Sequence, residues 1–200
     1  MLCRTFIVSL LGISLTGCIS LLPNAGELAP RLSLDPGGAM ATKTPAHSGA
    51  LVVMDPDAAA ILNTFSVAVA TGPYQYEYLA DAEWTDRVPV LLRRFLEQRF
   101  ENHMVFEAVG NQTEFPVGGY KLYTDVRAFH LDRTGKTPTA RIAYGARLLD
   151  KKGKVLGVRV FSAAAHPNGT SQTDTARALN EAAATVSDET VAWVRALVAQ

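Results

Sequence analysis

Apolar residues recur at helical spacing in the middle of the chain. They are Val88, Leu91, Leu92, Phe95, Leu96 and Phe100, and the positions between them carry Arg93, Arg94, Glu97 and Gln98. An apolar stripe opposite a charged one is typical of a helix that covers a core. The pattern predicts a helix over residues 87–103, with Asp86 as its N-cap. Phe95 should then be buried, and Arg94 should face water.

A second helical pattern, rich in alanine, fills the end of the chain. The apolar and small residues on its expected inner face are Ala176, Leu179, Ala183, Val186, Thr190, Val194 and Leu197. Ser171 is followed three residues later by Asp174, which resembles a capping box with aspartate in the acidic position. The pattern predicts a long helix over residues 172–199, and Ser187-Asp188 is the place where a break would be expected.

The remaining segments alternate or form short apolar runs, as strands do. The expected strands cover residues 50–54, 64–70, 74–79, 104–109, 120–131, 140–149 and 155–165, and a short helical turn is expected at 58–62. Turns with Gly135 and Gly153 join the last three strands into an antiparallel meander. Strands, helix, strands and helix in that order predict an α+β fold, in which two main helices pack on one face of a mainly antiparallel sheet.

The chain begins with one basic residue, Arg4, and an apolar run over residues 6–15. The run has about ten residues, whereas a helix that spans a bilayer needs about 20, so the pattern is typical of a cleaved secretory signal. Residues 15–18 read Leu-Thr-Gly-Cys, which resembles the bacterial lipobox. The resemblance implies cleavage before Cys18 and a diacylglycerol on its thiol, with acyl groups such as palmitate. The alternative is an ordinary secretory signal that contains a cysteine.

These patterns divide the chain into a signal peptide over residues 1–17, a lipidated amino terminus and flexible tether over 18–49, and one domain over 50–200. The tether is rich in Pro, Gly, Ala and Ser and has no regular period, although part of it, near residues 28–34, fits an edge strand. Two or three acyl chains suffice for stable anchoring. Ile19 stands where lipoproteins kept in the inner membrane often carry aspartate, so we expect the periplasmic face of the outer membrane.

Composition excludes several classes of function. The chain has 19 basic and 19 acidic residues, which gives no attraction to nucleic acid. Its two cysteines, Cys3 and Cys18, fall in the signal and the lipobox, and its four histidines lack metal-ligand spacing. No nucleophile elbow, phosphate loop or dinucleotide fingerprint occurs. Asp81, Glu83 and Asp86 fit either a glycosidase-like acid pair or a polar entry to the helix. We expect no catalytic residue, metal or cofactor, and no enzyme.

Aromatic residues cluster just before the first helix, at Tyr74, Tyr76, Tyr78 and Trp84. Such side chains bury a large area and still satisfy a polar tip, so they are common at interfaces. The three tyrosines should share one face of a strand, because side chains alternate along it. The sequence leaves two interpretations open: a surface for a partner or a second subunit, or ordinary core packing on the helix.

The order of these features resembles one protein family. A lipobox, a tether, a strand reading LVVMDP at residues 51–56, and a tyrosine-rich segment leading to Trp84 and an amphipathic helix are similar to the ABC-type transport auxiliary lipoproteins. The paraquat-inducible protein C lipoproteins belong to that group. The resemblance covers about residues 50–199 and rests on a loose motif.

The resemblance implies a non-enzymatic lipoprotein of the outer membrane. Its family works beside MCE-type systems that move lipids or solvents between the inner and outer membranes. The implied partners are an MCE-domain protein and the ABC permease and ATPase components, and self-association stays open. No catalytic residues carry over. A rival interpretation is a structural assembly lipoprotein of another outer-membrane machine.

Lipidation of Cys18 is the first testable prediction. Mass spectrometry of the mature protein should show diacylglyceryl-modified Cys18 at its amino terminus, because the lipobox directs cleavage there. Cys18→Ala should release the domain from membranes or block processing. An unmodified amino terminus at another residue would show that the segment is an ordinary secretory signal.

Overall fold

The computed structural model describes residues 30–38, 44–115 and 117–199, so the signal peptide (1–17) and Cys18 lie outside the described residues. The strand at the centre of the sheet is β7, Tyr120–Asp132. Antiparallel β8, Thr139–Leu149, follows one edge of β7 along its length. The other edge is shared by three parallel strands, β2 (His47–Val53), β3 (Asp57–Ala58) and β4 (Ser66–Gly72).

Four further strands extend this sheet. Two of them pair antiparallel: β9 (Val155–Ala165) pairs with β8, and β5 (Gln75–Trp84) pairs with β4. The other two pair parallel: β6 (Phe106–Gly110) pairs with β2, and β1 (Arg31–Leu32) pairs with β5. The result is a mixed sheet whose longest pairings, β7 with β8 and β8 with β9, are antiparallel. The predicted α+β class and the predicted meander are confirmed.

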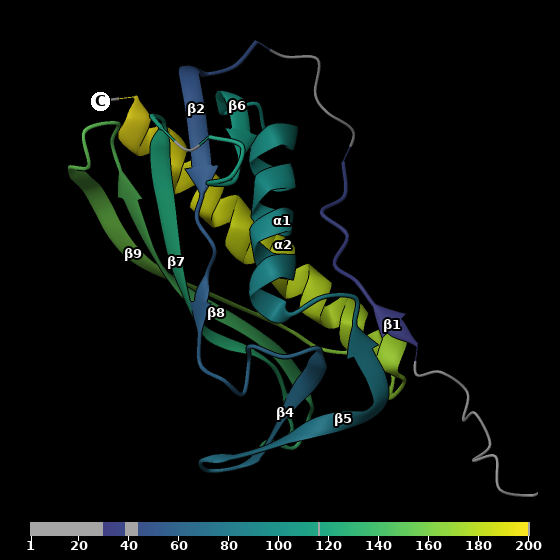
Figure 1. The fold of residues 1–200 in the computed structure, drawn as a ribbon. Helices are drawn as coiled ribbons and strands as arrows, with labels where there is room; N and C mark the ends of the chain where they lie inside the picture. Colours follow the sequence, from purple (N-terminus) through teal and green to yellow (C-terminus); the bar gives the residue numbers. More distant parts are fainter. Residues whose placement is uncertain (1–29, 39–43, 116, 200) are drawn as a thin grey trace, which may run out of the picture.

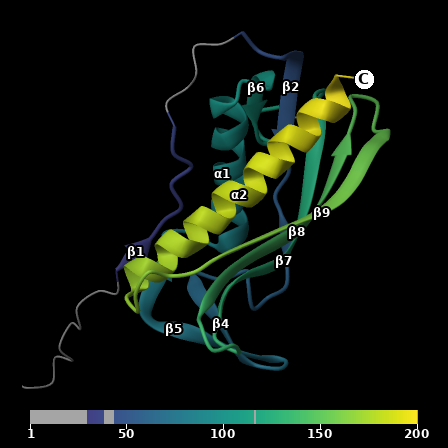
Figure 2. The same ribbon diagram turned by 180° about the vertical axis from the view of Figure 1, so that it is seen from behind.

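Both helices lie on one face of the sheet (Figures 1 and 2). α2 (Gln172–Val198) runs obliquely across β7, β8 and β9, and α1 (Val88–Asn102) lies beside it and contacts β2 and β6. We call the opposite face the open face, because neither described helix covers it. The sheet therefore has one side packed into a core and one side turned to solvent.

The helix ends agree with the sequence only in part. The capping box of α2 is confirmed: Asp174 N donates to Ser171 Oγ at 3.1 Å, and Ser171 N donates back to the Asp174 carboxylate at 3.3 Å. The N-cap of α1 is Arg87, without a side-chain cap, and not Asp86. Pro89 falls in the first turn, where its missing N–H needs no partner. Asp86 instead accepts a hydrogen bond from the Arg87 N–H at 2.8 Å.

α2 continues without a break through Ser187-Asp188. Ser187 is fully buried, and the Asp188 carboxylate reaches α1, where it pairs with Arg99 and lies 3.1 Å from His103 Nε2. A second link between the helices runs from Arg195 Nη2 to the His103 carbonyl at 2.8 Å. Tertiary contacts therefore hold α2 straight at a point where the local sequence favours an end.

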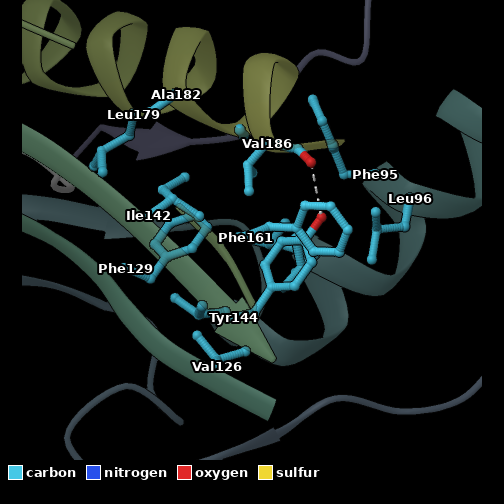
Figure 3. Packing of buried hydrophobic residues seen from close by; sticks show 14 of the residues in the cluster. Phe95, Leu96, Val126, Phe129, Ile142, Tyr144, Phe161, Leu179, Ala182 and Val186 are labelled. Carbon is cyan, nitrogen blue, oxygen red and sulfur yellow. Dashed lines mark hydrogen bonds between the residues drawn. The ribbon is translucent and has the colours of Figure 1, made fainter. Parts of the chain in front are cut away.

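The core between the helices and the sheet is built from side chains of both layers (Figure 3). Tyr144 of β8 is wholly buried there, beside Phe161 of β9 at 6.0 Å between ring centroids. Its hydroxyl hydrogen-bonds Thr190 Oγ1 at 2.8 Å and donates to the Val186 carbonyl at 3.4 Å. Burial raises the pKa of Tyr144 to about 12, so the phenol stays protonated and satisfied inside the core.

Residues 30–38 are packed on the domain, although they fall within the predicted tether at 18–49. β1 forms the predicted edge strand, and Leu32 and Leu34 pack against the core. Arg99 Nη1 donates to the Pro36 carbonyl at 2.6 Å, and Asp35 N donates to Asn180 Oδ1 at 2.8 Å. The folded domain therefore includes residues before the predicted boundary at residue 50.

The short helical turn predicted at residues 58–62 is present, but it begins one residue later. Leu62 N and Asn63 N both donate to the Ala59 carbonyl, at 2.8 and 3.0 Å, which closes a single turn. Asp57 and Ala58 before it form the short strand β3, which pairs with Asp125 and Val126 of β7. The start of the turn is therefore set by pairing with β7.

His130 is buried although it lies on the open face. It stands opposite Ala68 of β4, and the Tyr76 ring covers it edge-on, with 5.3 Å between ring centroids. Burial is the main cause that lowers the pKa of His130, and Arg141 adds to it, while Asp132 acts in the other direction. His130 is therefore kept neutral at a pH where a free histidine begins to ionise.

The packing of α1 predicts unequal losses at two adjacent residues. Phe95 is buried, so Phe95→Ala should lower the free energy of unfolding by about 3–5 kcal/mol through lost burial and an unfilled cavity. Arg94 is exposed beside Asp86 at 3.7 Å, so Arg94→Ala should lower it by about 0.5 kcal/mol or less. Urea denaturation measures both values, and equal losses would contradict the assigned helix face.

The lowered pKa of His130 predicts that acid destabilises the fold. The unfolded chain protonates His130 at its ordinary pKa of about 6.5, before the folded chain does, so the free energy of unfolding should fall as pH drops from about 7.5 to 5.5. Denaturation of the parent and of His130→Phe across this range measures the effect. Burial raises the pKa of Glu97 and Glu101, which changes stability in the opposite sense in both proteins. Identical pH profiles would contradict the assignment.

Candidate functional site

The β4–β5 hairpin lies at one end of the molecule, and its turn projects beyond the rest of the sheet (Figures 1 and 2). Gly72 of β4 pairs with Gln75 of β5, so only Pro73 and Tyr74 form the connection. Next to this turn lies the β7–β8 turn, since Arg133 N donates to the Ala70 carbonyl at 2.9 Å. The hairpin is thus held at its strands and free at its tip.

Tyr74 occupies a strained position at this tip. Its φ angle is 63°, and the residue is fully exposed. The left-handed conformation costs a residue with a Cβ about 1–2 kcal/mol, and turns with this geometry after proline favour glycine or asparagine. Strained backbone of this kind clusters at binding and catalytic sites. The turn therefore presents a large aromatic ring where local energetics favour a small residue.

Tyr76 and Tyr78 follow on β5 and point to the open face. They stand opposite Ala70 and Ala68, whose small side chains leave the rings uncovered. Their side chains are 43% and 47% exposed. The predicted shared face is confirmed for these two residues, whereas Tyr74 belongs to the turn and extends past the strand.

Trp84 does not belong to this surface, which corrects the predicted group of four. Its side chain is 0% exposed and meets Phe129 edge-on at 5.6 Å between ring centroids. Four residues of β5 lie between Tyr78 and Glu83, whereas one residue of β4 lies between their partners Ala68 and Ser66, and Asp81 takes a φ of 56°. This irregularity turns the end of β5 toward the helices, so Trp84 packs in the core. The core interpretation therefore holds for Trp84, and the exposed tyrosines remain candidates for a partner surface.

The three carboxylates near the helix entry do not converge. Glu83 lies 4.0 Å from Arg31, and Asp86 lies 3.7 Å from Arg94, while Asp81 is exposed at the bend of β5. Across the described residues, no group of three or more His, Cys, Asp or Glu side chains is arranged to hold a metal ion. The arrangement matches a polar entry to α1 better than an acid pair.

A hollow of about 430 Å³ lies on the open face between β7, β8, β9 and the segment before β3. Its charged lining residues from β7, β8 and the segment around β3 are Asp55, Asp57, Asp125, Arg127 and Arg147. Arg127 lies across Gly145, where a Cβ would come within 3.0 Å of its Nη2 atom, and it pairs with Asp125 at 3.3 Å. The sequence shows these residues only as the polar half of alternating strands, so their gathering was not predicted.

Neither described helix combines the length and the apolar composition that a membrane span requires. The membrane contact predicted from the sequence depends on Cys18, outside the described residues.

The chain is similar in sequence and in fold to several known proteins. The chain is 28% identical over 146 residues to an uncharacterised protein of Bradyrhizobium diazoefficiens, a match that covers 73% of this chain and 39% of that protein. The chain thus spans about two fifths of the length of the curated relative it matches. A crystal structure from Xanthomonas campestris, of the family DUF330, has a TM-score of 0.70 and 27% identity and covers 84% of this chain and 92% of its own.

A second crystal structure, of an uncharacterised protein, has a TM-score of 0.64 at 16% identity, over 82% of this chain and 96% of its own, and so shares the fold. A family model described as "ABC-type transport auxiliary lipoprotein component" matches residues 32–191. The match begins at β1, which agrees with the packing of residues 30–38 on the domain. The chain belongs to the family of ABC-type transport auxiliary lipoprotein components.

Proposed function

We propose that this protein is a periplasmic lipoprotein of the outer membrane that serves an ABC/MCE-type system moving lipids or solvents between membranes. Membership of the transport auxiliary family supports the general role. The partners are then an MCE-domain protein and the ABC permease and ATPase of the system. The protein acts by docking to a partner and catalyses no reaction.

The exposed tyrosines of the β4–β5 hairpin are the observation that carries the docking role. Within one short segment, Tyr74 is fully exposed, and Tyr76 and Tyr78 are 43% and 47% exposed. Tyrosine adds a large apolar area at low entropy cost and keeps a polar tip, and a few such residues usually supply most of an interface's free energy. The strain at Tyr74 supports the same conclusion, because a glycine there would fold more easily.

The carboxylates near α1 support a role without catalysis. Glu83 and Asp86 sit beside different arginines, so they are not poised as a general acid and a general base for one bond.

The anchor favours docking close to the membrane. With lipid on Cys18, the first described residue, Pro30, follows after 30 − 18 = 12 residues, a reach of at most about 40 Å. β1 pairs with Glu83 and Trp84, at the end of β5 that lies away from the tyrosine turn (Figure 1). Confinement near a surface raises the effective concentration for a partner there, so a modest interface suffices.

The docking role predicts that alanine at Tyr74, Tyr76 or Tyr78 weakens binding to the MCE-domain partner. The expected loss is at least about tenfold per residue, or about 1.4 kcal/mol, because each ring is an exposed anchor. Tyr123→Ala is the matched control, since Tyr123 is also exposed but lies on β7, away from the hairpin. Affinity is measured by surface plasmon resonance, after circular dichroism shows that each variant is folded.

Tyr74→Gly separates docking from stability. Glycine adopts a φ near 63° without strain, so this variant should melt at a higher temperature than the parent and still bind the partner less tightly. Unchanged binding by all folded tyrosine variants would contradict the proposed surface. Co-purification with components of another outer-membrane machine, and with no MCE or ABC component, would favour the structural assembly role instead.

A further inference from the structure

β9 forms a long edge of the sheet. It runs for 11 residues, and among the described residues only β8 pairs with it. The inner side of β9 packs under α2: the Phe161 ring meets Trp193 at 5.5 Å between centroids, and Gly157 lies against Leu197. The helix covers the face of this strand and leaves its outer edge open (Figure 2).

The turn before β9 sets which backbone groups point outward. Asp150 N donates to the Lys154 carbonyl at 2.9 Å, so the next pair, Leu149 with Val155, is of the kind that exchanges no direct hydrogen bonds. Along β8, the direction of the backbone hydrogen-bonding groups alternates from one residue to the next. The N–H and C=O groups of Leu148, Ala146 and every second residue before them therefore point toward β9. The residues of β9 that turn their N–H and C=O groups away from β8 are Val158, Val160, Ser162 and Ala164.

This edge lacks the features by which sheets prevent strand addition. Between Val158 and Ala165 it contains no proline and no lysine, and its register irregularity lies at the other end, near Leu149. The one charge there, Arg159, lies over the Phe161 ring at 4.9 Å, on the helix side. Val158 and Val160 are 69% and 52% exposed on the open face. An extended chain can therefore approach the edge without a steric or charged barrier.

The charges around the edge indicate which chain fits. Lys151, Lys152, Lys154 and Arg159 form no ion pair with any described residue. Asp150, at the turn, accepts hydrogen bonds from the Lys152 and Lys154 amides. The carboxylates of an added chain would meet these unpaired cations.

We propose that β9 is a strand-addition site for an extended segment of a partner protein in which apolar residues alternate with aspartate or glutamate. The apolar residues lie beside Val158 and Val160 on the open face, and the acidic residues lie on the side of Arg159. Main-chain hydrogen bonds supply affinity, and the alternation supplies specificity. The site is separate from the tyrosine hairpin and holds whether or not the hairpin docks.

The test uses a fluorescent octapeptide of alternating glutamate and valine, with alternating lysine and valine as its control. Fluorescence anisotropy with the parent protein should show at least tenfold tighter binding of the acidic peptide. Val160→Pro removes an outward N–H and leaves the β8–β9 bonds, so it should weaken binding at least tenfold. Val160→Thr keeps the N–H and should bind like the parent, as should Tyr78→Ala, which alters only the hairpin.

Amide hydrogen exchange of the parent gives a second readout that needs no variant. The amides of Val158, Val160 and Ser162 should become protected when the acidic peptide is added. Equal affinity for both peptides, or unchanged exchange at these amides, would overturn the proposal. A dimer of the parent that Val160→Pro converts to a monomer would also overturn it, because the edge would then take a second copy of the chain.

Discussion

The division of β7 between two sets of partners is the constraint on which the rest of the structure depends. One edge is occupied by β8 throughout, and the other is shared in parallel by β2, β3 and β4. α1 connects β5 to β6, and α2 follows β9, the last strand; both pack their apolar sides on the same side of the sheet. The opposite side is left with tyrosines, valines and charged residues of alternating strands. Both proposed contact regions, the hairpin and the β9 edge, follow from this arrangement.

Local pattern predicted the parts of the fold that local forces determine. The apolar stripe through Phe95 gave the buried face of α1, and Ser171 with Asp174 gave the start of α2. The parallel pairing of β4 with β7 joins residues about 60 positions apart, such as Ala68 with His130, and no local period encodes it. The turn expected at residues 58–62 begins one residue late for the same reason, since Ala58 pairs with Val126 of β7.

The candidate site, too, was predicted from local sequence pattern only in part. Alternation predicted that Tyr76 and Tyr78 share a face, and they do. Whether an aromatic residue is core or surface depends on the bend in β5, where Asp81 has a positive φ, and no local sequence pattern indicates that bend. Trp84 was therefore grouped with the tyrosines by proximity in sequence. The strain at Tyr74 likewise became visible only from the backbone, and it is the strongest indication that this turn serves more than the fold.

Photo-crosslinking in cells tests the docking role most directly. A photoreactive amino acid is placed at Tyr76, on the open face, and in a second strain at Thr185, on the exposed side of α2. Docking through the hairpin predicts a crosslink from position 76 to an MCE-domain protein, identified by mass spectrometry, and none from position 185. Crosslinks to that protein from position 185 alone would show that the helix side faces the transport system, and would contradict docking through the open face.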